Sequence, residues 1–207
     1  MLTVQEAAVT LSELIREDSR IEDIAEHLDK LGPAERRQQT LEVDGNLQKT
    51  LYERAQMSAP VDLEFFVPPH VPDTTEVIHY GRNSQPAFKY FQKRWTRPAG
   101  REGQLFGYNE ARARPLIGPG YFVAHPTDAE GSDVRGAVVV DYFMLPDAAV
   151  PAGWPAIKPN HRGLQMFVYN KTRDYMRRVS EHVSIGIAYR KEKTVLGYFL
   201  LCRDDKS

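Results

Sequence analysis

The sequence has few of the features that assign a chain to a class of protein at once. It holds a single cysteine, Cys202, so no intramolecular disulfide can form, and a reducing compartment is the simplest expectation. Its longest apolar runs are only a few residues, so no segment is expected to span a bilayer. The first residues lack the basic and apolar regions of a signal peptide. We therefore expect a soluble, cytoplasmic protein with no membrane partner.

The overall charge and the absence of repeats also leave the class of protein undetermined. The formal net charge is −1, which gives the whole chain no electrostatic signature for nucleic acid, so a nucleic-acid partner is not expected. The sequence contains no internal repeat, no low-complexity segment and no motif that identifies a cofactor. What it does contain is 207 residues, of which 42% are hydrophobic and 27% charged. This is the composition of an ordinary globular protein with room for one sizeable core.

The chain divides into three parts by composition. Residues 1–57 are acidic and carry apolar residues at helical spacing, which predicts four short helices, with Ser19 capping the second and Pro33 starting the third. Residues 58–76 contain four prolines around Phe65 and Phe66, which indicates a stiff connector that packs on the core. Residues 77–207 alternate between patterns typical of strands and of helices. The small helical subdomain at 1–57 could also bind a protein partner.

We expect residues 77–207 to form an α+β domain, in which a mainly antiparallel, curved sheet is packed by one long and one short helix. The short helix is predicted from Ser84 to about Trp95, and the long helix over about twenty residues from position 160. Strands are predicted over 104–109, 121–125, 136–145, 183–190 and 194–203.

The densest group of aromatic and hydrogen-bonding residues lies between positions 76 and 125. Such a composition suits a concave site, where aromatic rings form walls and a few polar groups orient the ligand. Residues 82–115 hold eight basic and two acidic residues, which favours an anionic ligand or a solvated basic face on the predicted short helix. Gly81 at the start of that helix would let a ligand approach the backbone. The expected ligand-binding residues are Tyr80, Arg82, Asn83, Lys93, Arg94, Tyr108, Tyr121 and Arg178.

Three residues are candidates for acid–base chemistry. Asp141 lies on the most apolar predicted strand, where burial would raise its pKa, although a structural ion pair with an arginine would explain it equally well. His182 lies beside Glu181 where the predicted long helix ends, and His79 lies at the start of the aromatic stretch. No two histidines have metal-ligand spacing on a helix, so no metal site is expected.

Two hypotheses about function follow. In the first, residues 78–125 and 177–184 form a pocket for an anionic or aromatic small molecule, with or without catalysis. In the second, the protein is a non-catalytic interaction module that binds a partner through residues 1–57. An exposed apolar stripe on residues 1–57 would favour the second.

Overall fold

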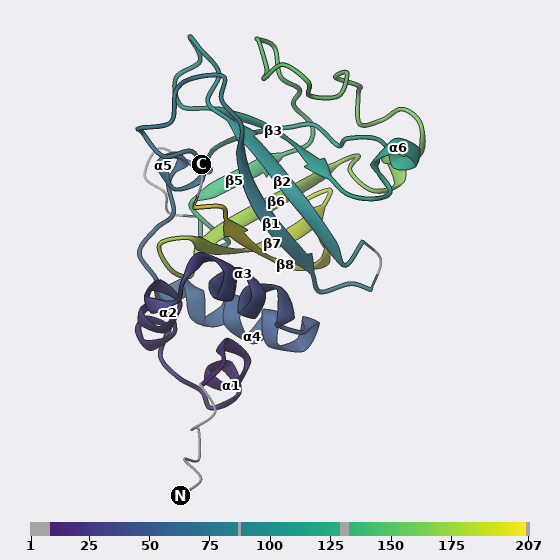
Figure 1. The fold of residues 1–207 in the computed structure, drawn as a ribbon. Helices are drawn as coiled ribbons and strands as arrows, with labels where there is room; N and C mark the ends of the chain where they lie inside the picture. The colour runs from purple at the N-terminus through teal and green to yellow at the C-terminus, as the bar shows by residue number, and fades with distance from the viewer. Residues whose placement is uncertain (1–8, 87, 129–132, 206–207) are drawn as a thin grey trace, which may run out of the picture.

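Eight antiparallel strands close into a barrel, and four N-terminal helices cover one side of it (Figure 1). The computed structural model describes residues 9–86, 88–128 and 133–205. Each strand pairs with the next along the chain, and β8 closes the barrel by pairing with β1. The helices are α1 Leu11–Arg16, α2 Ile21–Lys30, α3 Pro33–Glu42, α4 Gly45–Arg54, α5 Leu63–Phe66 and α6 Arg114–Ile117, with 3-10 turns η1 Ala55–Met57 and η2 Leu164–Phe167. The strands are β1 Val77–Asn83, β2 Tyr90–Thr96, β3 Leu105–Glu110, β4 Phe122–Pro126, β5 Val138–Asp141, β6 Thr172–Arg178, β7 Val183–Arg190 and β8 Thr194–Arg203.

The fold contains two separate apolar cores. The first lies outside the barrel wall, where Leu28 and Leu51 of the helices pack against outward-facing residues such as Ile185 and Leu200. The second fills the barrel interior around Trp95. Strands β5 to β8 therefore have apolar cover on both faces, as strands of a buried sheet do.

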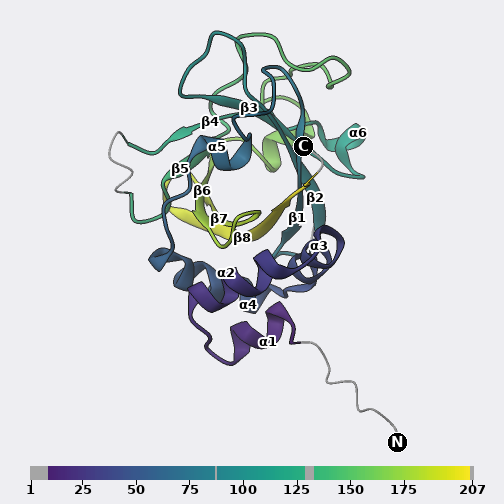
Figure 2. The same ribbon diagram turned by 60° about the vertical axis from the view of Figure 1, so that its left-hand side comes forward.

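One end of the barrel is closed by the proline-rich segment that precedes β1. Phe66 of α5 stacks on Trp95, with ring centroids 4.5 Å apart, and neither side chain is exposed. In Figure 2 the strands form a ring, and α5 lies across its near opening. Helix α6 and the β1–β2 hairpin lie at the opposite end (Figure 1).

Inward-facing glycines make room for aromatic rings inside the barrel. Gly81, Gly107 and Gly186 each lie directly opposite a phenylalanine on the neighbouring strand. A Cβ atom added to Gly186 would lie 2.3 Å from the ring of Phe199, so only glycine fits at this position. Such pairing of a glycine with a cross-strand aromatic ring helps a strongly curved sheet to close.

The α+β prediction with an open, curved sheet is wrong, because the sheet closes on itself. The prediction of one short and one long helix packed on this sheet is also wrong. The segment 84–95 forms the β1–β2 hairpin and most of β2, and the segment after 160 forms η2 and β6. The five predicted strands and the four N-terminal helices are confirmed, with shifts at some ends. The N-cap of α2 is Arg20 rather than Ser19.

Candidate functional site

A cavity of about 330 Å³ opens at the end of the barrel opposite α5. Its walls are mainly apolar and aromatic, and they include Phe91, Phe199 and the ring of Tyr169. Phe88 and Phe167 also line the cavity, and both are exposed to solvent at its entrance. The volume lies near the lower end of the range for small-molecule sites.

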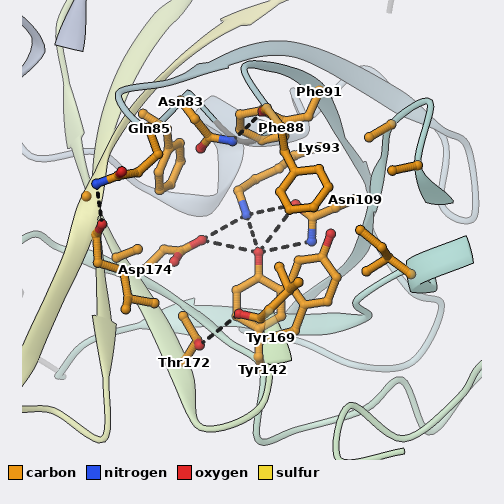
Figure 3. Close-up of a pocket in the computed structure, with 18 of the residues that line it drawn as sticks. Asn83, Gln85, Phe88, Phe91, Lys93, Asn109, Tyr142, Tyr169, Thr172 and Asp174 are labelled. Atoms are coloured by element: carbon orange, nitrogen blue, oxygen red, sulfur yellow. Dashed lines mark hydrogen bonds and ion pairs between the residues drawn. The ribbon is translucent and has the colours of Figure 1, made fainter. Parts of the chain in front are cut away.

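Four polar side chains meet at the floor of this cavity (Figure 3). Lys93 on β2 lies directly opposite Asn109 on β3. Tyr142 follows the last residue of β5, and Asp174 on β6 lies opposite Val140. Because strands place alternate residues on one face, Lys93 enters the barrel between Phe91 and Trp95 of its own strand. None of the four is more than 5% exposed.

The four side chains form one hydrogen-bonded network centred on the Lys93 ammonium. Lys93 Nζ lies 2.9 Å from Asp174 Oδ2, 2.5 Å from the Tyr142 hydroxyl and 3.3 Å from Asn109 Oδ1. The Tyr142 hydroxyl donates to Asp174 Oδ2 over 3.2 Å. Asn109 Nδ2 donates to the Tyr142 hydroxyl and to the Gly120 carbonyl, both over 3.0 Å. The network is therefore a salt bridge whose ammonium is held by two further acceptors.

Burial shifts the ionisation of this network. It lowers the pKa of Lys93, and the Asp174 carboxylate opposes that shift. It raises the pKa of Asp174, and Lys93 opposes that shift in turn. The pKa of Tyr142 is raised well above its usual value, again by burial, so its hydroxyl stays protonated at neutral pH. Burial thus disfavours the charged forms of Lys93 and Asp174, whereas their mutual attraction favours those forms.

Aromatic rings complete the surroundings of the ammonium. Lys93 Nζ lies 4.9 to 5.1 Å from the ring centroids of Phe122, Tyr142 and Phe199, within the range of cation–π attraction. The Tyr169 ring stacks on Tyr142, with centroids 5.4 Å apart. The four polar side chains of the floor are thus held in place by many simultaneous contacts.

Of the residues predicted to bind a ligand, Asn83 and Lys93 line the cavity. Lys93 enters it from a strand, not from the solvent face of a helix. The remaining six have partners elsewhere, and their role in binding stays a prediction. Tyr80 stacks on Arg37, Arg82 donates to the Leu41 carbonyl, Arg94 pairs with Glu76, Tyr108 packs on Trp154, Tyr121 donates to the Pro155 carbonyl, and Arg178 lies over the Phe65 ring.

The three residues predicted to be catalytic lie at separate places. His79 is fully buried inside the barrel, and its Nε2 donates to the Phe66 carbonyl over 3.0 Å. Burial lowers its pKa to about 3, so it is a neutral imidazole. Asp141 faces outward and accepts from Arg173 over 2.9 Å, which is the structural ion pair considered above. His182 accepts from Arg203 at the outer surface. None of the three lines the cavity.

Asn109, Tyr142, Tyr169 and Asp174 are cavity residues that the sequence analysis did not assign to the site. The signal for Asp174 was present, since Thr172, Asp174 and Met176 alternate as the inward face of a strand would. Reading that segment as a helix concealed it. Among the described residues, no three histidine, cysteine or acidic side chains lie close enough to hold a metal ion. Nor is any described helix long and apolar enough to cross a membrane.

The chain was also compared with known proteins. No protein-family model matches it, and no curated protein or solved structure does so either. Function can therefore be inferred only from the chemistry of the site.

Proposed function

We propose that this protein binds a small, largely apolar molecule inside its barrel, with the polar end of the molecule against the Lys93–Asp174 floor. The observation that carries the proposal is the contrast between apolar walls and a compact polar network at their base. A ligand site of this kind gains affinity from the walls and orientation from the few polar groups.

The arrangement of the N-terminal helices supports the same proposal. The apolar stripe that would serve a partner protein includes Leu11, Ile24 and Leu51, none of which is exposed at all. It packs on the outer wall of the barrel, so its apolar residues are already used. Acid–base catalysis by His79, Asp141 and His182 would require these residues to share one cavity, and they lie apart. Ligand binding needs only the groups that already converge.

Binding can be tested with N-phenyl-1-naphthylamine, a neutral fluorophore that brightens in apolar surroundings. Ala188 lines the cavity opposite Asp174, so Ala188→Phe should fill part of it and weaken probe binding by at least about tenfold. Val195→Phe is the matched control, because it adds an aromatic ring to the neighbouring strand at a residue that is 45% exposed and does not line the cavity. Equal probe affinity in wild type and Ala188→Phe would refute binding in the barrel.

A further inference from the structure

The hydrogen-bond donors at the cavity floor are all engaged within the floor itself. The Lys93 ammonium has three N–H groups, and it has three acceptors in Asp174, Tyr142 and Asn109. The Asn109 amide has two N–H groups, and both have acceptors. The single Tyr142 proton has an acceptor in the floor too, either Asp174 Oδ2 at 3.2 Å or Asn109 Oδ1 at 3.4 Å. An incoming group that can only accept hydrogen bonds therefore finds no free donor among these three side chains.

One strong acceptor is left over. Asp174 Oδ2 receives both Lys93 and Tyr142, whereas within the described part of the chain no donor reaches Asp174 Oδ1. This second oxygen has no partner, yet it is not one of the unpartnered side-chain atoms that are fully buried. It therefore keeps some accessible surface, which opens to the cavity. Figure 3 shows it turned away from the network, with no contact drawn to it.

The charges at the cavity floor also favour a neutral hydrogen-bond donor. An anionic group at the floor would meet the Asp174 carboxylate, and the Lys93 charge is already balanced by that carboxylate. A cationic group would compete with Lys93 for the same partner. A neutral donor avoids both costs, since it can donate to Asp174 Oδ1 without bringing a charge into the cavity.

We propose that the natural ligand of this cavity is a neutral apolar molecule that ends in a hydroxyl or amide group, and that Asp174 Oδ1 is the acceptor which recognises it. The proposal rests on the proposed function, because it names the class of ligand for the same site. It differs from the expectation of an anionic ligand, which relied on Arg82 and Arg94. Those two arginines lie outside the barrel on partners of their own.

The test is a set of competitors built on a ten-carbon chain that displace the fluorophore from the full chain at neutral pH. 1-Decanol carries a donor, decyl methyl ether only an acceptor, and decanoate a negative charge. A hydrogen bond to a charged acceptor should make 1-decanol bind at least about tenfold more tightly than the ether or decanoate. Decanoate or the ether binding as tightly as 1-decanol would overturn the proposal. If the fluorophore itself is bound and blocked by Ala188→Phe, that result leaves the proposed function intact.

A variant with an apolar floor provides the second arm. Lys93→Met combined with Asp174→Leu removes both charges together, which proteins often tolerate when the volume is kept. This double variant should still bind the fluorophore, but it should bind 1-decanol no better than the ether. Retention of the alcohol preference would show that Asp174 is not its source. A matched control is Lys171→Met, which removes an exposed lysine outside the cavity and should leave the preference unchanged.

Discussion

Substituting Lys93 by methionine should destabilise the protein severely and in a pH-dependent way. Lys93 is 1% exposed and its ammonium lies 2.9 Å from Asp174 Oδ2, so the variant leaves a buried carboxylate without its cation. Removing one partner of a buried ion pair typically costs about 3–5 kcal/mol. That is a large share of the roughly 5–15 kcal/mol that holds a domain folded. A solvent-exposed lysine, in contrast, would contribute less than about 0.5 kcal/mol.

The pH dependence follows from the ionisation of Asp174. Burial already raises its pKa, and Lys93 is the main group opposing that shift, so the variant should raise it further. A group whose pKa is raised in the folded state favours folding at low pH, and this advantage is lost as pH rises through the folded-state pKa. The stability deficit of Lys93→Met should therefore be small near pH 5 and grow toward pH 8, by up to about 1.4 kcal/mol per pH unit.

Urea unfolding followed by tryptophan fluorescence measures this directly, because Trp95 is fully buried in the barrel core. Unfolding free energies of wild type and Lys93→Met would be compared at several pH values between 5 and 8. The double variant Lys93→Met with Asp174→Leu should recover most of the stability and lose the pH dependence. A single variant within about 1 kcal/mol of wild type at every pH would refute the placement of Lys93 in a buried ion pair.

Three further predictions follow from the structure. Because the pKa of His79 is lowered to about 3, the free energy of unfolding of wild type should decrease as pH falls below 6.5, by up to about 1.4 kcal/mol per pH unit. Urea unfolding should show a weaker pH dependence in His79→Gln, whereas the control His161→Gln, at an exposed position, should keep the wild-type dependence. Gly186→Ala should lower the thermal midpoint and cost about 1–3 kcal/mol by overpacking against Phe199, whereas Gly32→Ala, with nothing within 4 Å of its added Cβ, should cost under about 0.5 kcal/mol. A chain that starts at residue 58 keeps every strand but exposes the outer apolar wall, so we expect barrel circular dichroism together with concentration-dependent aggregation; a fully unfolded product would contradict the proposed division of the chain.

Short-range signals in the sequence were sufficient for part of this fold. The hairpin of β7 and β8 is confirmed at both ends, because its apolar strands flank a polar turn at 191–193. Helices α1, α2 and α4 are confirmed because each carries an apolar stripe on one face. Helix α3 is confirmed through its start at Pro33, although the residues that it buries are Arg36, Gln39 and Thr40. In these segments the local pattern and the tertiary environment agree.

One of the two errors arises where a strand is covered on both faces. In β6, Met176 faces the barrel interior while Tyr175 faces the helices, and both are buried. Such a strand loses the alternation of apolar and polar residues, and its spacing then resembles a helix. In β2, Phe91 and Trp95 fit a helical spacing as well as a strand, and only pairing with β1 and β3 decides between them. Closure of the barrel depends on the β1–β8 pairing, which no local pattern encodes.

The same geometry explains why the site could not be read from the sequence. Lys93, Asn109, Tyr142 and Asp174 are spread over 82 positions, and only the closed sheet brings them together. Their place among aromatic rings also bears on their purpose. Replacing a buried ion pair with apolar side chains of similar volume is often neutral or stabilising, so stability alone does not account for a lysine and an aspartate at this position. The pair lies where the cavity ends, with one carboxylate oxygen facing the open space. The proposed recognition of a ligand would account for that position, whereas a contribution to folding would not.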